Sequence, residues 1–179
     1  LGAHAFPKEF KDNHQGYIDM IVNEMIPAIA KEKLADYIDI FCERNYFSVE
    51  EMDTILRAGI AVGLKPKVHV NQFSAMGGIA KAVELGALSV DHLEEIDQED
   101  IEALKGSDTM PTILPSCFHV TTAMALAAIG CHMLVEKPLA ISLVEVEDLV
   151  SLVKKRQCLL QVGYNLRFLP ALREFGKRI

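Results

Sequence analysis

Polar residues that could do chemistry follow or end several apolar segments in the first two-thirds of the chain. His4 follows "LGA", and Glu43 follows "DIFC". His69 lies within "KVHV", with Gln72 just beyond it, and His92 lies within "SVDHL". Imidazole nitrogens bind metal ions, and histidine changes its charge near neutral pH. If these side chains converge, they could bind a metal or a substrate and carry protons.

Each of these residues also has a plain structural interpretation. A single histidine at a strand end is commonly a hydrogen-bonded structural or surface residue, and Glu43 could simply cap the loop that follows it. Three histidines on consecutive segments favour a shared site, because the carboxyl ends of the strands of a (β/α) barrel converge on one face. Convergence therefore depends on whether these segments are parallel strands.

The segments that would position these residues alternate between strand and helix. Short apolar runs predict strands, and apolar residues three and four positions apart predict helices. The predicted strands are 1–5, 35–42, 65–70, 87–93, 109–115, 132–136 and 158–164, and the predicted helices are 14–33, 48–63, 77–86, 97–106, 119–130, 142–157 and a last one from 170. This alternation predicts an α/β fold with a parallel sheet and right-handed crossovers. Periodicity alone leaves a barrel and an open sheet as alternatives.

Two of the predicted helices begin with the pattern of a capping box. Ser48 has Glu51 three residues on, and Ser142 has Glu145 at the same spacing. In a capping box the serine oxygen and the glutamate carboxylate each accept a hydrogen bond from the other residue's backbone N–H. We expect both helices to begin at these serines.

The composition is typical of a globular protein and excludes some function classes. The net charge of −7 argues against nucleic-acid binding, and no apolar run reaches the roughly 18 residues of a membrane helix. No signal peptide is visible, and Leu1 in place of Met suggests a fragment. The widely spaced cysteines predict reduced thiols in a cytoplasmic protein; they are Cys42, Cys117, Cys131 and Cys158.

Residues 1 to about 117 resemble the imidazolonepropionase family of metal-dependent amidohydrolases. The resemblance lies in "LGAHAFPKEF", "ADYIDIFCE", "FSVEE", "KVHVNQFSAMGG", "ELGALSVDHLE" and "TMPTILPSC", which follow one another in the family's order. It implies a TIM-like (β/α) barrel that binds zinc or iron. The implied reaction is hydrolysis of the ring amide of 4-imidazolone-5-propanoate to N-formimino-glutamate, a step of histidine degradation.

This resemblance also implies roles for four residues. His69 would be a metal ligand and His4 would bind the substrate. His92 would lie beside the metal-bound water as a stabiliser or proton carrier, and Gln72 would contact the substrate or the water. The family's paired His-x-His ligands and its aspartate ligand have no counterparts in this sequence. Because catalytic zinc normally has three protein ligands, the resemblance implies that hydrolysis is lost in this chain.

The last third of the chain resembles a different family, the glucose-fructose oxidoreductases and inositol dehydrogenases. The stretches "HMLVEKPLA" and "QVGYNLRF" carry the resemblance. It implies the second half of a Rossmann-like fold that binds NAD or NADP. Lys137 would be catalytic at the junction of nicotinamide and substrate, while Asn165 and Arg167 would line the substrate cleft. Glu136 and Pro138 would shape the cofactor-binding turn at the strand end, where an X–Pro bond can be cis.

A plain alternative exists for this segment too. Lys137 and Arg167 could be ordinary solvated charges. No G-x-G-x-x-G sequence follows any predicted strand, so the half of a dinucleotide fold that binds the phosphates is not recognisable.

The two resemblances meet near Cys117–His119 without a linker. We assign residues 1–118 to a partial TIM-like barrel and residues 119–179 to a partial Rossmann-like βα segment. The two parts carry net charges of −10 and +3. Natural fusions join complete domains, so a join inside two incomplete folds indicates a chimera, a rearranged clone or two polypeptides read as one chain. The alternative is a natural protein in which half a Rossmann sheet has replaced half a barrel.

Three functions therefore stay open. The first is a metal-dependent hydrolase, the second is an NAD(P)-dependent oxidoreductase, and the third is an α/β scaffold without catalytic activity. A small molecule would be the substrate of either enzyme. Unpaired sheet edges lead us to expect a homo-oligomer or poor solubility.

Overall fold

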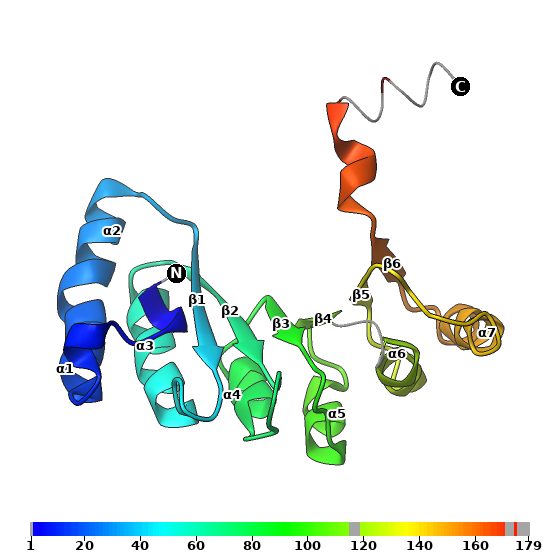
Figure 1. Ribbon diagram of the computed structural model, residues 1–179, viewed down its shortest axis with the longest axis horizontal. Helices are drawn as coiled ribbons and strands as arrows, with labels where there is room; N and C mark the ends of the chain where they lie inside the picture. The colour runs from blue at the N-terminus through cyan, green and yellow to red at the C-terminus, as the bar shows by residue number, and fades with distance from the viewer. Residues whose placement is uncertain (1, 115–118, 171–173, 175–179) are drawn as a thin grey trace.

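A six-stranded parallel sheet forms the centre of the molecule in the computed structural model, which describes residues 2–114, 119–170 and 174 (Figure 1). The strands are β1 (Tyr37–Cys42), β2 (Lys65–Val70), β3 (Ser89–His92), β4 (Met110–Ile113), β5 (Met133–Glu136) and β6 (Leu160–Gly163). They are hydrogen-bonded in chain order, and every pair is parallel. The predicted α/β fold with a parallel sheet is confirmed.

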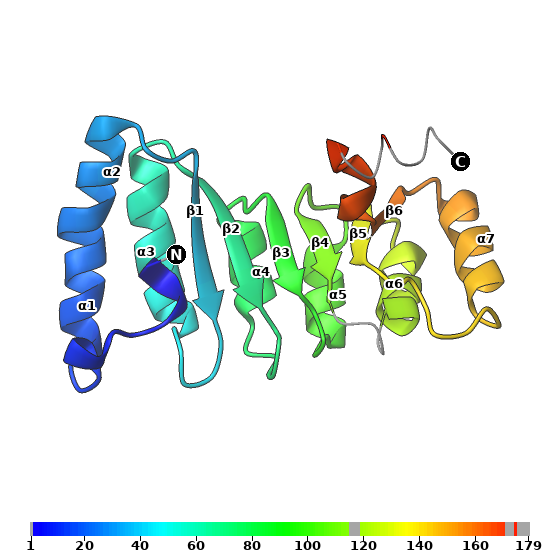
Figure 2. The same ribbon diagram turned by 45° about the horizontal axis from the view of Figure 1, so that its top comes forward.

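Helices cover one face of this sheet. They are α1 (His14–Met20), α2 (Ile26–Glu32), α3 (Val49–Ala61), α4 (Gly78–Glu84), α5 (Gln98–Leu104), α6 (His119–Ala128) and α7 (Val146–Arg156). Figures 1 and 2 show α3 to α6 in a row along that face, with the short helical turn η1 (Gly2–His4) beside β1 at one end of the sheet and η4 (Asn165–Phe168) on the side opposite the helices. Sequential strands with one layer of helices are the arrangement of a (β/α) barrel, but in the described residues β1 and β6 are not paired, so barrel closure stays a prediction.

Alternation along the strands separates an apolar face from a polar one. In β1, Ile38, Ile40 and Cys42 are buried towards the helices, and Asp39 and Phe41 are half-buried on the opposite side. β1 lies so close to α3 that a Cβ atom at Gly59 would be 2.5 Å from Ile38 Cδ1. The helix-free face is therefore the one on which polar side chains can meet.

The predicted helix 14–33 forms, with a widened turn inside it. The π-helical segment η3 (Ile21–Met25) joins α1 to α2 and ends two residues before Pro27, in the first turn of α2. Proline has no N–H to donate within a helix, and a π turn is one way in which a helix accommodates such a loss. The helix remains continuous and covers the end of the sheet beside β1.

The predicted strand 1–5 is wrong. Residues 2–4 form the turn η1 instead, with Ala3 buried. The Tyr17 hydroxyl donates a hydrogen bond of 2.8 Å to the carbonyl of Gly2. This side chain satisfies a backbone group that a strand would have paired with a neighbour, so the segment lies beside β1 without adding a strand to the sheet.

One of the two predicted capping boxes is present. The Glu51 N–H donates to Ser48 Oγ at 3.2 Å, and the Ser48 N–H donates to Glu51 Oε2 at 2.8 Å. The box predicted at Ser142 is wrong, since α7 begins at Val146.

The local geometry explains why the second box fails. Ser142 Oγ accepts a hydrogen bond from the N–H of Val144 at 3.3 Å, which competes with helix formation. Leu143 and Val144 are more than 80% exposed, so no burial favours an earlier helix start.

A single apolar core runs through both parts of the chain. Its buried members extend from Ala3 to Cys158. β4 pairs with β5 through Thr112 opposite Leu134 and Ile113 opposite Val135. The boundary at 118 stays a prediction, and Cys117 and nearly all of the predicted last helix lie outside the described residues. Among the described helices, none has both the length and the apolar character needed to cross a membrane.

Candidate functional site

The carboxylate of Asp39 lies between two histidines on the helix-free face. Its Oδ2 atom is 3.2 Å from His4 Nε2, and its Oδ1 atom is 3.0 Å from His69 Nδ1. The three side chains come from β1, η1 and β2, and each is a little over one quarter exposed. We call these three residues the His–Asp–His cluster.

The strand register and one tyrosine position the cluster. Phe41 pairs with His69 across β1 and β2, which brings His69 beside Asp39 on the same face. His4 is placed by η1, whose Gly2 carbonyl is held by Tyr17 from the neighbouring helix. Two members therefore stand on paired strands, and the third stands on a turn with its own anchor.

Opposing charges stabilise the ionised form of this carboxylate. Burial alone would raise the pKa of Asp39, but hydrogen bonds and attraction from His4 and His69 outweigh it and hold the pKa well below its usual range. The hydrogen bond to Asp39 in turn raises the pKa of His69, against the effect of burial. Asp39 is therefore an anion throughout the neutral range.

His92 lies beside the cluster with an acidic partner. Its ring centroid is 5.5 Å from that of His69, and its Nδ1 atom is 3.3 Å from Glu94 Oε1. Burial lowers the pKa of His92, with a further contribution from His69, while burial raises the pKa of Glu94 to about 7. A carboxyl group that keeps its proton close to neutral pH can pass that proton to an imidazole in contact with it.

The backbone at this point adopts an uncommon conformation. The φ angles of His92 and Leu93 are 97° and 61°, in the region that favours glycine. Such conformations concentrate at functional sites, where the surrounding structure holds them in place. The carboxyl end of β3 therefore turns sharply at His92.

Glu43 binds the residue that follows it, and it also binds the loop after β2. The buried carboxylate accepts backbone hydrogen bonds from Arg44 at 2.7 Å, Phe73 at 2.8 Å and Ser74 at 3.2 Å, and another from the Ser74 hydroxyl. Gln72, half-buried, lies at the start of this loop. Glu43 thereby fixes the segment that carries Gln72.

The site residues predicted in the last third lie at other strands. Glu136 ends β5 and is half-buried, and a Cβ atom at Gly163 of β6 would be 2.9 Å from Glu136 Oε1. Lys137 and Pro138 follow, both exposed, and the bond between them is cis.

The remaining two predicted residues belong to η4. Asn165 is exposed there. The backbone of Arg167 lies in the same turn, and its side chain is outside the described residues. The structure therefore brings together His4, His69 and His92, while Glu136 and Lys137 stand two strands further along the sheet.

Asp39 was missed by sequence reasoning. The alternation in "YIDIFC" does put it on the face opposite Ile38 and Ile40, but an exposed surface position produces the same pattern. The signal that could have found it is an acidic residue inside a strand of a predicted barrel, where such a face points towards the site.

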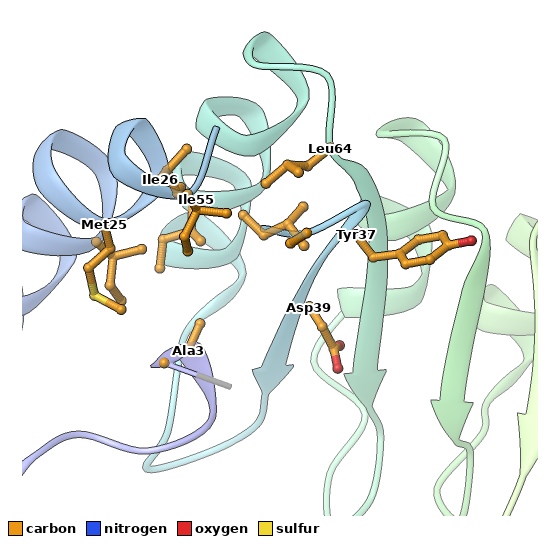
Figure 3. Close-up of a pocket in the computed structure, with 12 residues that line it drawn as sticks. Ala3, Met25, Ile26, Tyr37, Asp39, Ile55 and Leu64 are labelled. Carbon is orange, nitrogen blue, oxygen red and sulfur yellow. The ribbon is translucent and has the colours of Figure 1, made fainter. Parts of the chain in front are cut away.

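A small cavity lies behind this carboxylate. It has a volume of about 140 Å³ and lies between β1 and the helices that flank it. Figure 3 shows Asp39 pointing away from Met25, Ile26 and Ile55, which line the apolar part. Among the described lining residues, Asp39 alone carries a charge at neutral pH. The packing between β1 and the flanking helices is therefore incomplete next to the His–Asp–His cluster.

The donor set of the cluster fits a transition metal. One potential ligand atom from each of His4, Asp39 and His69 lies within 4.8 Å of the others. Imidazole and carboxylate are ligands of zinc and of non-haem iron, and catalytic zinc sites commonly have three protein ligands. The residues present are therefore compatible with the metal that the first resemblance implies.

Comparison with known proteins supports both resemblances. Residues 69–164 match the family described as "Oxidoreductase family, NAD-binding Rossmann fold". The imidazolonepropionase of Flavobacterium johnsoniae is 63% identical over 117 residues, and that of Flavobacterium psychrophilum is 65% identical over the same length. Each match covers 65% of this chain and 28% of the relative, so the chain spans little more than a quarter of these proteins.

Solved structures are more distant. A UDP-N-acetylglucosamine 3-dehydrogenase from Acidithiobacillus ferrooxidans is 21% identical, with a TM-score of 0.43, and the match covers 65% of this chain and 34% of that one.

Proposed function

The chain belongs to the oxidoreductase family with an NAD-binding Rossmann fold, and we propose that the site it forms best is nevertheless a hydrolytic one. The proposed reaction is metal-dependent hydrolysis of the ring amide of 4-imidazolone-5-propanoate to N-formimino-glutamate. The observation that carries this proposal is the meeting of His4, Asp39 and His69 beside His92, which ends β3. Identity of 63% to an imidazolonepropionase over 117 residues supports the substrate.

Each residue of the site has its own role in the proposed reaction. A zinc or iron ion, when bound, supplies an activated water and polarises the amide carbonyl. His69 would hold the ion, and Asp39, which contacts its imidazole, is a further candidate ligand. His92, kept neutral by burial, accepts a proton on one ring nitrogen while Glu94 orients the other. Gln72 contacts the substrate or the water.

The ligand count bears directly on this proposal. The sequence retains one of the ligands expected from the resemblance, which implies a lost activity. Asp39 and His4 beside His69 add two candidate ligands, which supports a working centre instead. An assay of turnover decides between these two expectations.

The test follows the absorbance of 4-imidazolone-5-propanoate with Zn²⁺ or Fe²⁺ present. We expect the chain to accelerate hydrolysis over buffer that contains the same metal. His92→Gln is expected to slow it by about 100-fold or more, because a positioned acid–base group contributes at least that much. The matched control is His132→Gln, an exposed histidine whose ring accepts a hydrogen bond from Leu159, as a glutamine can. No acceleration by the parent chain would refute the hydrolase.

A second candidate is NAD(P)-dependent oxidation or reduction, which the family match over 69–164 favours. Lys137 would act at the nicotinamide–substrate junction, with Glu136 and Pro138 shaping the turn that contacts the cofactor. Asn165 and Arg167 would line the cleft. Against it stands the lack of a G-x-G-x-x-G sequence after any strand.

Fluorescence titration with NADH and NADPH tests this second candidate. Saturable quenching, weakened about tenfold by Lys137→Met and unchanged by Lys154→Met on α7, is the expected result. A linear response at all concentrations would remove nicotinamide binding from this chain. If neither hydrolysis nor nicotinamide binding is found, the scaffold without catalytic activity is the remaining function.

A further inference from the structure

His119 is a buried histidine to which neither candidate reaction gives a role. It begins α6, its side chain is fully buried, and its Nδ1 atom lies 2.7 Å from the carbonyl oxygen of Pro138. A carbonyl oxygen only accepts hydrogen bonds, so Nδ1 carries a hydrogen and donates it. Pro138 directly follows Lys137, the residue after β5. We propose that His119 is a positioning residue for Lys137, which it fixes through the backbone of the turn at 137–138.

A well-packed helix supports the imidazole. α6 lies against β4 and β5. Its residues Val120, Ala123 and Leu126 are buried in the apolar core. Side chains on such an element hold a neighbouring group more precisely than side chains on a loop. The hydrogen bond from His119 therefore ties the turn after β5 to a firmly packed part of the fold.

The segment 137–145, which contains this turn, has few other polar attachments. In the part of the chain that the structure describes, its remaining hydrogen bonds join near neighbours in the sequence. Leu139 packs against the core, while Ile141, Leu143 and Val144 are more than 80% exposed. Without the imidazole, the turn would keep apolar contacts but lose its hydrogen bond to α6.

The second ring nitrogen of His119 indicates that the imidazole does more than fill space. Nε2 is buried and, among the described residues, has no hydrogen-bond partner. A buried polar atom without a partner costs free energy, and an apolar side chain of similar size would avoid this cost. Leucine at this position would lose the bond to Pro138 and also the unpaired nitrogen. Because these two effects offset each other, we expect leucine to release the turn without lowering the stability of the fold.

This inference deepens the second candidate function and rests on it for the role of Lys137 beside a nicotinamide. The hold on the turn, however, is measurable without a cofactor. A chain whose turn loosens in a His119 variant, but which binds no NADH, would refute nicotinamide binding and leave the positioning of Lys137 standing. A chain that binds NADH and has the same turn in every variant would overturn the inference and leave the second candidate standing.

Backbone NMR relaxation of the full chain measures the turn directly. His119→Leu lacks the donor, and the side-chain nitrogen of His119→Asn can take the place of Nδ1. We expect exchange broadening of the Lys137 and Leu139 amide signals in the leucine variant, and signals like those of the parent in the asparagine variant. Unchanged signals in His119→Leu would overturn the proposal.

Thermal unfolding of the same proteins separates positioning from a general loss of structure. The midpoints of the parent, His119→Leu and His119→Asn should agree within about 3 °C. A much lower midpoint in the leucine variant would assign a structural role to His119 and overturn the proposal.

Affinity for NADH shows whether the effect passes through Lys137. His119→Leu is expected to weaken binding about fivefold and Lys137→Met about tenfold. The double variant should bind no more weakly than Lys137→Met, because a residue that acts by placing the lysine has nothing left to place. His132→Leu, an exposed histidine at the other end of β5, is the matched control and should bind like the parent. Losses that multiply in the double variant would show that His119 acts independently of Lys137, against the proposal.

Discussion

Asp39 shows why single residues decide this site. Its two oxygens each contact a different imidazole, and one of these imidazoles belongs to a segment 35 residues away in the chain. The histidines stand out in the sequence because they follow apolar runs. An aspartate in an alternating strand does not, since its neighbours depend on how η1 and β2 are placed beside β1. The candidate site could therefore be predicted for its histidines but not for the residue between them.

Glu94 predicts a specific pH dependence of stability. Burial raises its pKa from an ordinary value of 4.5 to about 7, so the folded state binds a proton that the unfolded state has released. The stability that this proton contributes is fully present below pH 4.5 and is lost as the pH rises towards 7.

Glu94→Gln should remove this dependence, because the amide keeps the shape and does not ionise. Above pH 7 we expect the variant to be more stable than the parent by about 1–3 kcal/mol, measured by urea unfolding across pH 4 to 8. Parallel pH profiles of the two proteins would contradict the assignment.

Tyr17 predicts a second effect at a single residue. Tyr17→Phe removes the hydroxyl that holds the Gly2 carbonyl, at a cost of about 1 kcal/mol in the free energy of unfolding. The loosened turn should broaden the NMR signals of His4 and leave those of His92 unchanged. Identical His4 signals in both proteins would show that other contacts hold η1.

Helices and strands were largely predictable because their signals are local. The periodicity places β2 at 65–70 as the structure does, and Ser48 caps α3 as expected. The errors arise where tertiary packing overrides a local pattern. The first residues are mostly apolar, but the carbonyl of Gly2 is paired with Tyr17 instead of a neighbouring strand, and Ser142 precedes apolar residues that are exposed.

The two serines provide a matched pair of variants. Ser48→Ala removes a formed cap and should lower the free energy of unfolding by about 1 kcal/mol. Ser142→Ala, at an identical sequence pattern without the cap, should change it by less than about 0.5 kcal/mol. Thermal and urea unfolding of both variants checks the difference, and equal losses would contradict the structural distinction.

One sheet contains strands from both parts of the chain, residues 1–118 and residues 119–179, which resemble different families. The sequence indicated a chimera of incomplete domains, and the structure pairs β4 with β5 and buries residues of both parts in one core. The sequence could not predict how well the two parts pack against each other. That depends on side chains at the junction of β4 and β5, which we call the seam. Homo-oligomer formation through the free edges stays a prediction.

Shared packing predicts cooperative unfolding. Val135→Ala at the seam truncates a fully buried side chain and should cost about 1–3 kcal/mol. Signals of His69, in the first part, should then disappear at the same lowered temperature as the overall helix content. Val150→Ala, on an exposed part of α7, is the control and should change little. Two separate transitions, with His69 unaffected, would show independent parts.

The order of the strands also bears on how the chain is made. Among the described strands, β2 to β6 each pair with the strand that precedes them in the chain, and none pairs with a strand distant in the sequence. Contacts of short sequence separation form quickly, and a nascent chain folds from its N-terminus as it is synthesised. Each βα unit can therefore dock as it leaves the ribosome on a sheet edge that is already in place, and that edge advances by one strand with every unit translated.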